Sequence, residues 1–448
     1  MNLRDKKILV VGMGVSGTAC AIFLKKTGAD ITITDMAQEK ELGPCLSMLR
    51  RADIKTEPGC HRMETFENAD LIILSPGVPS TIPHIKRAEK KNIPVWGEIE
   101  LASRFIKEPI IGITGTNGKT TTTTLLGQML KNSGFKVFVG GNIGTPLMEY
   151  VSRGEKADII VAELSSFQLD TIDEFRPVVS LLLNVSEDHL DRYTDMASYA
   201  ESKGRIFKNQ TKEDVAILNG SDPYVKHLAK GIKPKKKFFY TSINNSGGDG
   251  GQENLFDNNM KNKIDFSGYH LRGRHNMENA MAAAMAAMAV NGTLKGIQSA
   301  LNNFKGLPHR LEHVAVINNI SFFDDSKATN VDAVKRALQA FDEPVVLIMG
   351  GRDKGGGYEK LLRCKGKPIK EVIVMGEAKE KIRSAFENTI AIQAVSSMET
   401  AVASAYACAD SGDIILLSPA CSSFDMFESY THRGEQFKKA VLKIENRG

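Results

Sequence analysis

The chain has 448 residues, of which 42% are hydrophobic and 25% charged, and its formal net charge is +5 at pH 7. These values suit a globular protein of two to four domains. A net charge this small, spread evenly along the chain, argues against a nucleic-acid-binding or membrane-binding protein.

Cysteine spacing, the N-terminus and the apolar runs indicate in which compartment the protein works. The six cysteines form no Cys-x-x-Cys pair and no zinc spacing, so we expect reduced thiols in or near the core. Residues 1–7 lead directly into an apolar run without a signal-peptide pattern. The longest apolar stretch, 280–290, is too short to span a bilayer and predicts a core helix. We therefore expect a cytoplasmic protein.

The first 97 residues alternate strand and helix patterns. An apolar strand at 8–11 is followed by Gly12-Met13-Gly14-Val15-Ser16-Gly17 and a helical pattern, and a second strand at 31–34 ends at Asp35. A G-x-G-x-x-G turn with an acidic residue about 20 positions later is typical of a Rossmann-like nucleotide-binding unit. The pattern predicts a nucleotide or its diphosphate at this turn without saying which one.

A later strand, at 71–74, ends in Ser75-Pro76-Gly77-Val78-Pro79. A loop at the carboxyl edge of an open α/β sheet is a usual place for a ligand. Locally, a rigid turn explains the same residues equally well.

The stretch Gly112-Ile113-Thr114-Gly115-Thr116-Asn117-Gly118-Lys119-Thr120 organises the middle of the chain. It follows a strand-like run at 109–113 and precedes a helical pattern. Glycines let backbone N–H groups face phosphate oxygens, Lys119 can reach a terminal phosphate, and the Thr120 hydroxyl can hold Mg²⁺. Ile113 stands where the general phosphate-loop pattern requires glycine, so a plain glycine-rich turn is the alternative. We favour the phosphate loop, because Gly-x-x-Gly-Lys-Thr between a strand and a helix rarely arises from packing alone.

Polar residues also follow the next three predicted strands, at 137–139, 158–163 and 178–183. Asn142 comes after the first, Glu163 ends the second, and Asn184 to His189 follow the third. These strands end at the same sheet edge as the phosphate loop, so we expect a metal–nucleotide site there. Glu163 is a natural Mg²⁺ ligand. His189 is a ligand, a hydrogen-bond donor or only a surface residue.

Two helical patterns of the middle region carry polar residues whose roles the local sequence does not decide. The amphipathic pattern at 196–210 contains Lys203, which on local grounds we expect to be solvated. Asn276 and Asn279 begin the Ala/Met-rich helix, either as caps or as readers of a nucleotide base.

Two other stretches predict surface structure. The lysine-rich run at 233–237 precedes a strand-like run at 238–240 and is expected to be a solvated edge. Residues 243–262 are rich in Gly, Asn and Asp, which predicts a surface loop.

Residues 307–448 form a third α/β unit, in which polar residues again follow strands. Its alternating strand and helix patterns predict a largely parallel, doubly wound sheet. The expected strands lie at 314–317, 321–323, 345–349, 371–374, 390–394 and 414–417. The predicted fold class is α/β with three domains: a Rossmann-like N-terminal domain at 1–97, a central P-loop ATPase domain at 98–306, and a C-terminal Rossmann-like, doubly wound domain at 307–448.

Five motifs taken together resemble the Mur ligases, which are ATP-dependent amide-forming enzymes of peptidoglycan precursor synthesis. They are Thr114 to Thr120, the strand end at Glu163, Asn184 to His189, Gly273-Arg274-His275-Asn276 and Pro308-His309-Arg310. Within the family, the loops at 325–330 and 417–423 resemble the member that adds D-glutamate. The D-N-P-R motif of the diamino-acid-adding member does not occur in this sequence.

The resemblance implies a set of site residues, grouped by ligand. The implied catalytic residues are Lys119, Glu163, His189 and Lys203. The implied ATP site comprises Gly115, Thr116, Asn117, Gly118, Lys119, Thr120, Thr121, Asn276, Asn279, Arg310 and Asp325. The implied UDP-substrate site comprises Gly14, Val15, Ser16, Asp35, Ser75, Gly77 and Asn142, and the implied D-glutamate site comprises Thr329, Lys354, Ser423 and Phe424.

The implied cofactors are ATP and two Mg²⁺ ions, held by Thr120, Glu163, His189 and a carbamylated Lys203. Only the resemblance overturns the local expectation that Lys203 is solvated. The implied substrates are UDP-N-acetylmuramoyl-L-alanine and D-glutamate, and the implied protein is a cytoplasmic monomer that binds neither nucleic acid nor membrane. The implied chemistry activates a carboxylate as an acyl phosphate, which an amine then attacks.

Three alternatives stay open at this point. The glycine turn with Asp35 would also suit a nicotinamide-dependent oxidoreductase, although that reading leaves the phosphate loop unused. A nucleotide-gated binding protein would use the loop without catalysis. A ligase similar to folylpolyglutamate synthases would use the same loops on another acceptor.

Overall fold

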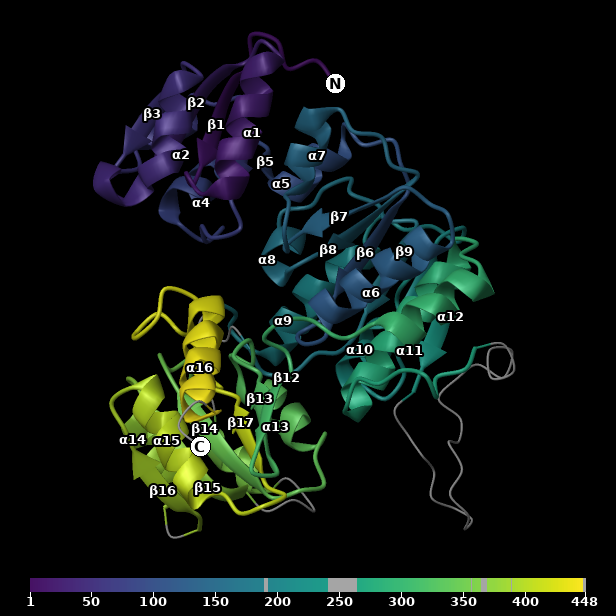
Figure 1. Ribbon diagram of the computed structural model, residues 1–448. Helices are drawn as coiled ribbons and strands as arrows, with labels where there is room; N and C mark the ends of the chain where they lie inside the picture. Colours follow the sequence, from purple (N-terminus) through teal and green to yellow (C-terminus); the bar gives the residue numbers. More distant parts are fainter. Residues whose placement is uncertain (189–191, 241–263, 356, 364–368, 388, 446–448) are drawn as a thin grey trace.

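The structure is a computed structural model that describes residues 1–188, 192–240, 264–355, 357–363, 369–387 and 389–445. Three sheets follow one another along the chain and form three α/β units (Figure 1). The first unit lies beside α5 and α7 of the second, and the third unit lies below α9 to α11 in the view of Figure 1. The predicted α/β class with three domains is confirmed. The domain limits at 97 and 306 remain predictions.

The first unit is a five-stranded parallel sheet in the order β3-β2-β1-β4-β5. Its carboxyl edge carries the glycine turn after β1 and the Ser75 loop after β4. Its strands are β1 (Lys7–Val11), β2 (Asp30–Asp35), β3 (Lys55–Pro58), β4 (Leu71–Leu74) and β5 (Val95–Gly97). Its helices are α1 (Val15–Lys26), α2 (Glu39–Arg51), α3 (Met63–Glu67) and α4 (Pro83–Lys90), and α5 (Glu98–Ser103) leads into the second unit.

The second unit is a six-stranded parallel sheet in the order β11-β10-β9-β6-β8-β7. Its strands are β6 (Ile110–Thr114), β7 (Val137–Gly141), β8 (Ile159–Glu163), β9 (Val179–Leu182), β10 (Val215–Asn219) and β11 (Lys235–Phe239). Its helices are α6 (Lys119–Asn132), α7 (Leu147–Arg153), α8 (Ser166–Leu169), α9 (Met196–Gly204), η1 (Arg205–Phe207), α10 (Pro223–Leu228), α11 (Arg274–Ala289) and α12 (Leu294–Asn303).

The third unit is a six-stranded sheet in the order β12-β13-β17-β14-β15-β16. Its strands are β12 (Glu312–Ile317), β13 (Ile320–Asp324), β14 (Val345–Gly350), β15 (Ile369–Met375), β16 (Ala391–Ala394) and β17 (Ile414–Leu417). Its helices are α13 (Val331–Leu338), η2 (Tyr358–Arg363), α14 (Lys379–Phe386), α15 (Met398–Cys408) and α16 (Tyr430–Glu445).

All six strands predicted for this third unit are found. The sheet is parallel except at β12 and β13, which form an antiparallel hairpin. Asn318 and Asn319 make its turn with φ of 50° and 63°, a conformation that asparagine tolerates better than most residues.

The central strands form because their residues are apolar without alternation. Every residue of β6 and of β14 is buried, as expected for parallel strands covered by helices on both faces. Helix α11, the Ala/Met-rich segment, is buried along most of its length and packs against α6. It is therefore the core helix that the sequence predicted, and it holds the residues at its N-terminus rigidly beside the phosphate loop.

The lysine-rich run is a solvated edge, as predicted, because Lys235 to Lys237 are exposed on the edge strand β11. This strand begins before the predicted run at 238–240, because pairing with β10 begins at Lys235. Trp96 and Gly97 belong to β5, which pairs with β4. Cys60 is exposed, although Cys20 and Cys421 are buried as expected. The predicted loop at 243–262 and Cys364 lie outside the described residues.

Within the described ranges, no helix is both long and apolar enough to cross a membrane.

Candidate active site

The phosphate loop connects β6 to α6, as the sequence predicted. Ile113 belongs to β6 and pairs with Glu163 on β8. The position where the general pattern requires glycine is therefore a buried strand position, and the isoleucine side chain packs in the core. Gly118 is the N-cap of α6 with φ of 85°. A Cβ there would lie 2.2 Å from Asn279 Oδ1. Only glycine fits both this backbone conformation and this close approach.

Asn184, directly after β9, fixes the shape of the loop. Its Oδ1 accepts from the Asn117 backbone N–H at 2.8 Å, and its Nδ2 donates to the Asn117 carbonyl at 3.0 Å. Thr116 and Ser186 are also bonded to each other through side chain and backbone. The loop is therefore held open by its neighbour strand before any phosphate is bound, which lowers the entropy cost of binding one.

Three cationic side chains converge on this loop. Lys119 Nζ donates to the carbonyls of Gly115 and Thr116, both at 2.8 Å, and Lys203 Nζ donates to Gly115 at 3.0 Å. Arg310, from the third unit, donates to Thr120 Oγ1 at 2.7 Å. A site with this excess of positive charge suits a polyanion such as a nucleoside triphosphate.

Lys203 is only 1% exposed, so the local expectation of a solvated lysine is wrong. Helix α9 turns it into the core, where its ammonium lies 4.4 Å from the centre of the Tyr199 ring. Burial lowers the pKa of Lys203 well below its usual value, and the positive charge of Lys119 adds to this effect. Burial also lowers the pKa of Lys119, against the attraction of Glu163.

Glu163 ends β8 and is 2% exposed. Its Oε1 accepts from Asn142 Nδ2 at 2.8 Å, whereas its Oε2 is buried with no hydrogen-bond partner in the described part of the chain. A buried carboxylate oxygen without a partner is costly unless a cation or a donor completes it. This oxygen beside the phosphate loop fits a divalent cation.

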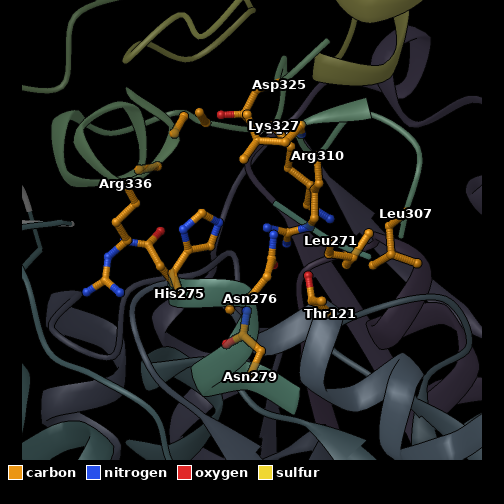
Figure 2. Close-up of a pocket in the computed structure, with 16 residues that line it drawn as sticks. Thr121, Leu271, His275, Asn276, Asn279, Leu307, Arg310, Asp325, Lys327 and Arg336 are labelled. Atoms are coloured by element: carbon orange, nitrogen blue, oxygen red, sulfur yellow. Dashed lines mark hydrogen bonds between the residues drawn. The ribbon is translucent and has the colours of Figure 1, made fainter. Parts of the chain in front are cut away.

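A pocket lies between the N-terminus of α11 and the third unit (Figure 2). His275, Asn276 and Asn279 rise into it from α11, and Arg310 and Lys327 enter from the opposite side. Its other lining residues include Asn117, Gly118, Thr121, Leu271, Leu307, Asp325 and Arg336. The mixture of amides, charges and flat apolar sides suits a nucleoside.

The two asparagines are not helix caps. Gly273 is the N-cap of α11 and no side chain caps this helix, while Asn276 Nδ2 donates to the Arg272 carbonyl at 2.7 Å. This contact holds Asn276 in the pocket. The capping alternative is therefore wrong, and the base-reading alternative stays a prediction.

Asp325 closes the pocket from the third unit. Its Oδ2 accepts from Ser418 Oγ at 2.9 Å and its Oδ1 from the Leu311 backbone N–H at 3.3 Å. Burial raises the pKa of Asp325 to about 7, although Ser418 and Arg310 act in the opposite direction. A carboxyl group so poised changes its protonation near neutral pH.

Asp332, on α13, bonds the third unit to the phosphate loop. Its Oδ2 accepts from Asn117 Nδ2 at 3.0 Å, from Ser186 Oγ at 2.9 Å and from Arg336 Nε at 2.8 Å. Asp332 was not predicted from the sequence, because only the fold shows that α13 faces the loop.

A second pocket lies next to these contacts, between the second and third units. Glu187, Asp188, Lys335, Lys354 and Lys360 are among its lining residues, and Lys360 pairs with Glu187 across it. Lys354, predicted to bind D-glutamate, is thus on the side of the site that carries Asp188. An amino acid with two carboxylates would find several lysines here.

The first unit presents its predicted residues at the carboxyl edge of its sheet. Asp35 accepts from the backbone N–H groups of Met13, at 2.7 Å, and Ala37, at 2.8 Å. Ser75 Oγ donates to Gly12 at 3.1 Å. These contacts shape the glycine turn, while Val15 is exposed beside it.

A third pocket joins the Ser75 loop to Arg192 and Tyr193 of the second unit. Arg192 Nη2 donates to the Gly77 carbonyl at 2.8 Å. This contact, which the sequence did not predict, connects the predicted UDP-substrate loop to the unit that carries the phosphate loop.

The other residues predicted to bind D-glutamate do not line the same pocket as Lys354. Ser423 is buried, Thr329 is half-buried and the Phe424 side chain is 65% exposed. None of these three lines the pockets described above. His189 lies outside the described residues, so its prediction stays untested.

Three family models cover most of the chain. They are the Mur ligase MurD-like N-terminal domain at residues 6–97, the Mur ligase middle domain at 113–287 and the Mur ligase glutamate ligase domain at 309–421. The chain is 49% identical over 448 residues to the UDP-N-acetylmuramoylalanine–D-glutamate ligase of Desulfosudis oleivorans, covering 99% of this chain and 98% of that protein.

The chain belongs to the Mur ligase family.

A second relative is the UDP-N-acetylmuramoylalanine–D-glutamate ligase of Desulfatibacillum aliphaticivorans, which is 47% identical to this Mur ligase. The alignment covers 98% of this chain and 99% of that protein. The MurF ligase of Thermotoga maritima, solved in complex with ADP, superposes with a TM-score of 0.61 at 17% identity, covering 93% of this chain and 96% of that one. UDP-N-acetylmuramate–alanine ligase MurC from the same organism gives 0.58 at 20% identity, covering 99% and 100%. At such identities the structures confirm the fold, and the family makes this chain an ATP-dependent ligase.

Proposed function

We propose that this Mur ligase joins D-glutamate to UDP-N-acetylmuramoyl-L-alanine in peptidoglycan precursor synthesis, with ATP converted to ADP and phosphate. The curated relatives at 47% and 49% identity support this choice of substrates. The observation that carries the chemistry is the phosphate loop with Lys119 and Lys203 on one side and the unpartnered Glu163 Oε2 on the other.

In the first step, an oxygen of the L-alanyl carboxylate attacks the γ-phosphorus of ATP. The bond to the bridging oxygen breaks, and ADP leaves with that electron pair. Two anions approach each other here, so the site must offset their repulsion. Lys119 and Arg310 supply positive charge, and the loop N–H groups ordered by Asn184 bind phosphate oxygens.

In the second step, the amine of D-glutamate attacks the acyl carbon of the acyl phosphate and phosphate leaves. Lys354 would pair with a carboxylate of D-glutamate, and Thr329, Ser423 and Phe424 would complete this subsite. The acyl phosphate is hydrolysed if water enters, so contact between the second and third units, as at Asp332, would protect it.

The buried Glu163 Oε2, which has no partner among the described residues, fits a divalent cation, and we propose two Mg²⁺ ions at this site. Thr120 and Glu163 would hold one, and His189 and a carbamylated Lys203 would hold the other. When bound, the ions would supply charge that neutralises the γ-phosphate.

Carbamylation of Lys203 has a physical basis. Burial lowers the pKa of Lys203, which favours its neutral amine, and a neutral amine adds to CO₂ to give a carbamate and a proton. The product would be an anion between Lys119 and Arg310, which suits metal binding.

Recognition of the nucleotides follows from the pockets. Asn276, Asn279, Arg310 and Asp325 would hold the adenosine and phosphates of ATP in the pocket of Figure 2. The UDP-substrate would lie along the first unit, from the glycine turn to the Ser75 loop and Asn142. Gly14, Val15, Ser16, Asp35, Ser75 and Gly77 would surround it. The protein would act as a monomer in the cytoplasm.

A phosphate-release assay with purified protein tests this function. We expect phosphate only when UDP-N-acetylmuramoyl-L-alanine, D-glutamate, ATP and Mg²⁺ are all present, and none when L-glutamate replaces the D-isomer. A folate acceptor with glutamate is the matched control for a folylpolyglutamate synthase-like ligase. No phosphate with all four components, or equal activity on the folate acceptor, would refute the proposal.

A further inference from the structure

Arg433 on α16 is a buried cation that the proposed mechanism does not use. Its side chain is among the largest that are fully buried, at 1% exposed. Its Nη2 donates to the carbonyls of Ser326, at 2.8 Å, and Cys421, at 3.1 Å, and its Nη1 donates to that of Gly350 at 3.4 Å. No carboxylate of the described residues lies within ion-pair distance of it, so the guanidinium is engaged by backbone carbonyls instead.

These three carbonyls belong to three different loops of the third unit. Ser326 follows β13, Gly350 ends β14 and Cys421 follows β17, and these strands are neighbours in the order β13-β17-β14. Hydrogen bonds between paired strands fix the positions of the strands, but they do not fix the loops that follow them. A planar guanidinium that donates to all three loops fixes their spacing, because its N–H groups diverge at set angles.

The same loops carry the proposed D-glutamate residues. Thr329 is three residues after Ser326, Lys354 is four residues after Gly350, and Ser423 is two residues after Cys421. Two of the loops are also joined by a backbone bridge between Arg352 and Ser422. Arg433 therefore contacts the backbone of all three loops that carry the proposed subsite.

Packing around the guanidinium leaves little freedom. Gly351 has φ of 133°, and a Cβ there would lie 3.1 Å from Arg433 Nη1 and 2.2 Å from the Ser422 carbonyl. The Tyr358 hydroxyl bonds to Asp353 at 2.8 Å and to Cys421 Sγ at 3.1 Å, which ties the same two loops once more. A shorter cation at 433 would leave some of these carbonyls without a donor, at a cost to loop order.

We propose that Arg433 is a positioning residue that sets Thr329, Lys354 and Ser423 in register for D-glutamate, acting through the carbonyls of Ser326, Gly350 and Cys421. This inference rests on the proposed function. It predicts a selective loss of D-glutamate binding, because the loops at Gly350 and Cys421 contribute no residue to the lining of the ATP pocket. Asp325, next to Ser326, is held separately by Ser418 and the Leu311 backbone.

The test compares Arg433→Met and Arg433→Lys with Phe437→Leu. Phe437 is one turn further along α16, fully buried in the core behind the sheet, and touches none of the three loop carbonyls. For each variant we would measure the melting temperature, the KM values for D-glutamate, ATP and UDP-N-acetylmuramoyl-L-alanine, and ADP–ATP isotope exchange without D-glutamate. The exchange reports the first step alone.

We expect Arg433→Met to raise the KM for D-glutamate at least about tenfold, as the loss of one charged hydrogen bond would. Arg433→Lys should lie between it and the wild type. In both, ADP–ATP exchange and the other KM values should stay close to wild type. Phe437→Leu should lower the melting temperature without changing the KM for D-glutamate.

An unchanged KM for D-glutamate in Arg433→Met, or an equal rise in Phe437→Leu, would overturn the inference. If Arg433→Met does not fold, Arg433→Lys decides by the same comparison. Failure of the proposed function is distinct, because then the wild type itself would make no D-glutamate-dependent product.

Discussion

Replacing Asp325 by Asn should stabilise this Mur ligase while it impairs ATP binding. Asp325 is buried against Ser418 and the Leu311 backbone. Burial raises the pKa of its carboxyl group from 3.8 to about 7. The folded chain therefore binds this proton more tightly than the unfolded chain does. Between about pH 4 and pH 7 the folded state carries the extra proton, so the free energy of unfolding falls as pH rises through this window.

The size of the effect follows from the two pKa values. At about 1.36 kcal/mol for each pKa unit, Asp325 lowers the free energy of unfolding by about 2 kcal/mol at pH 5 and by about 4 kcal/mol at pH 8. Asn has the same shape and does not titrate. The gain in stability from Asp325→Asn should therefore be about 2 kcal/mol larger at pH 8 than at pH 5.

Scanning calorimetry with the wild type and Asp325→Asn at pH 5 and pH 8 measures this difference. Glu98→Gln is a matched control. Burial raises the pKa of Glu98 from 4.5 to about 7, and its Oε1 accepts from the Met148 backbone N–H at 2.6 Å, remote from the proposed ATP site. Its pH-dependent gain should be similar in size. Only Asp325→Asn should raise the KM for ATP. If the variant and the wild type change stability equally between the two pH values, the reasoning from burial is refuted.

Four further outcomes are expected. Lys203→Ala should lose most activity and recover part of it with short-chain carboxylates, measured by phosphate release; full activity without them would exclude a role in metal binding. Glu163→Gln should lower kcat at least about a hundredfold while the melting temperature holds or rises, since it removes an unpartnered buried charge. Gly434→Ala should raise the KM for ATP about tenfold, because its Cβ would lie 2.3 Å from His309 Nδ1, next to Arg310. Small-angle scattering should change when ATP and UDP-substrate are added, and an unchanged curve would count against closure of the units.

Most strands at the centre of each sheet could be predicted, whereas the edge strands β3 and β5 were not. The interior strand β10 was also missed, although it reads Val-Ala-Ile-Leu-Asn. Central parallel strands are covered on both faces, so their sequences are continuous Val, Ile and Leu runs, as in β4 and β14. Edge strands lack such runs. β3 reads Lys-Thr-Glu-Pro and becomes a strand only through its pairing with β2. Tertiary pairing, not local preference, decides such segments.

The phosphate loop and Glu163 were predictable because loop chemistry and strand ends are local patterns. Lys203 was not, because a helical lysine shows nothing of the core that surrounds it. Asp332 and Arg433 were missed for a related reason: each acts by bonding segments that the sequence places far apart. Contacts between units, such as Asp332 with Asn117, are 215 residues apart along the chain.

Arg310 connects the third unit to the phosphate loop in this structure. It donates to Thr120 Oγ1, the oxygen that the loop chemistry assigns to a metal ligand. A guanidinium and a divalent cation on one hydroxyl oxygen repel each other strongly in a buried site. If Thr120 holds Mg²⁺ as proposed, Arg310 would have to leave Thr120 when ATP binds, and a phosphate oxygen of ATP would be a suitable acceptor for it. His309 and Leu311, on either side of Arg310, have φ of 65° and 43°, so the backbone at this position is already constrained. Movement of Arg310 would then shift the start of β12, and ATP binding at the phosphate loop would be coupled to the position of the third unit.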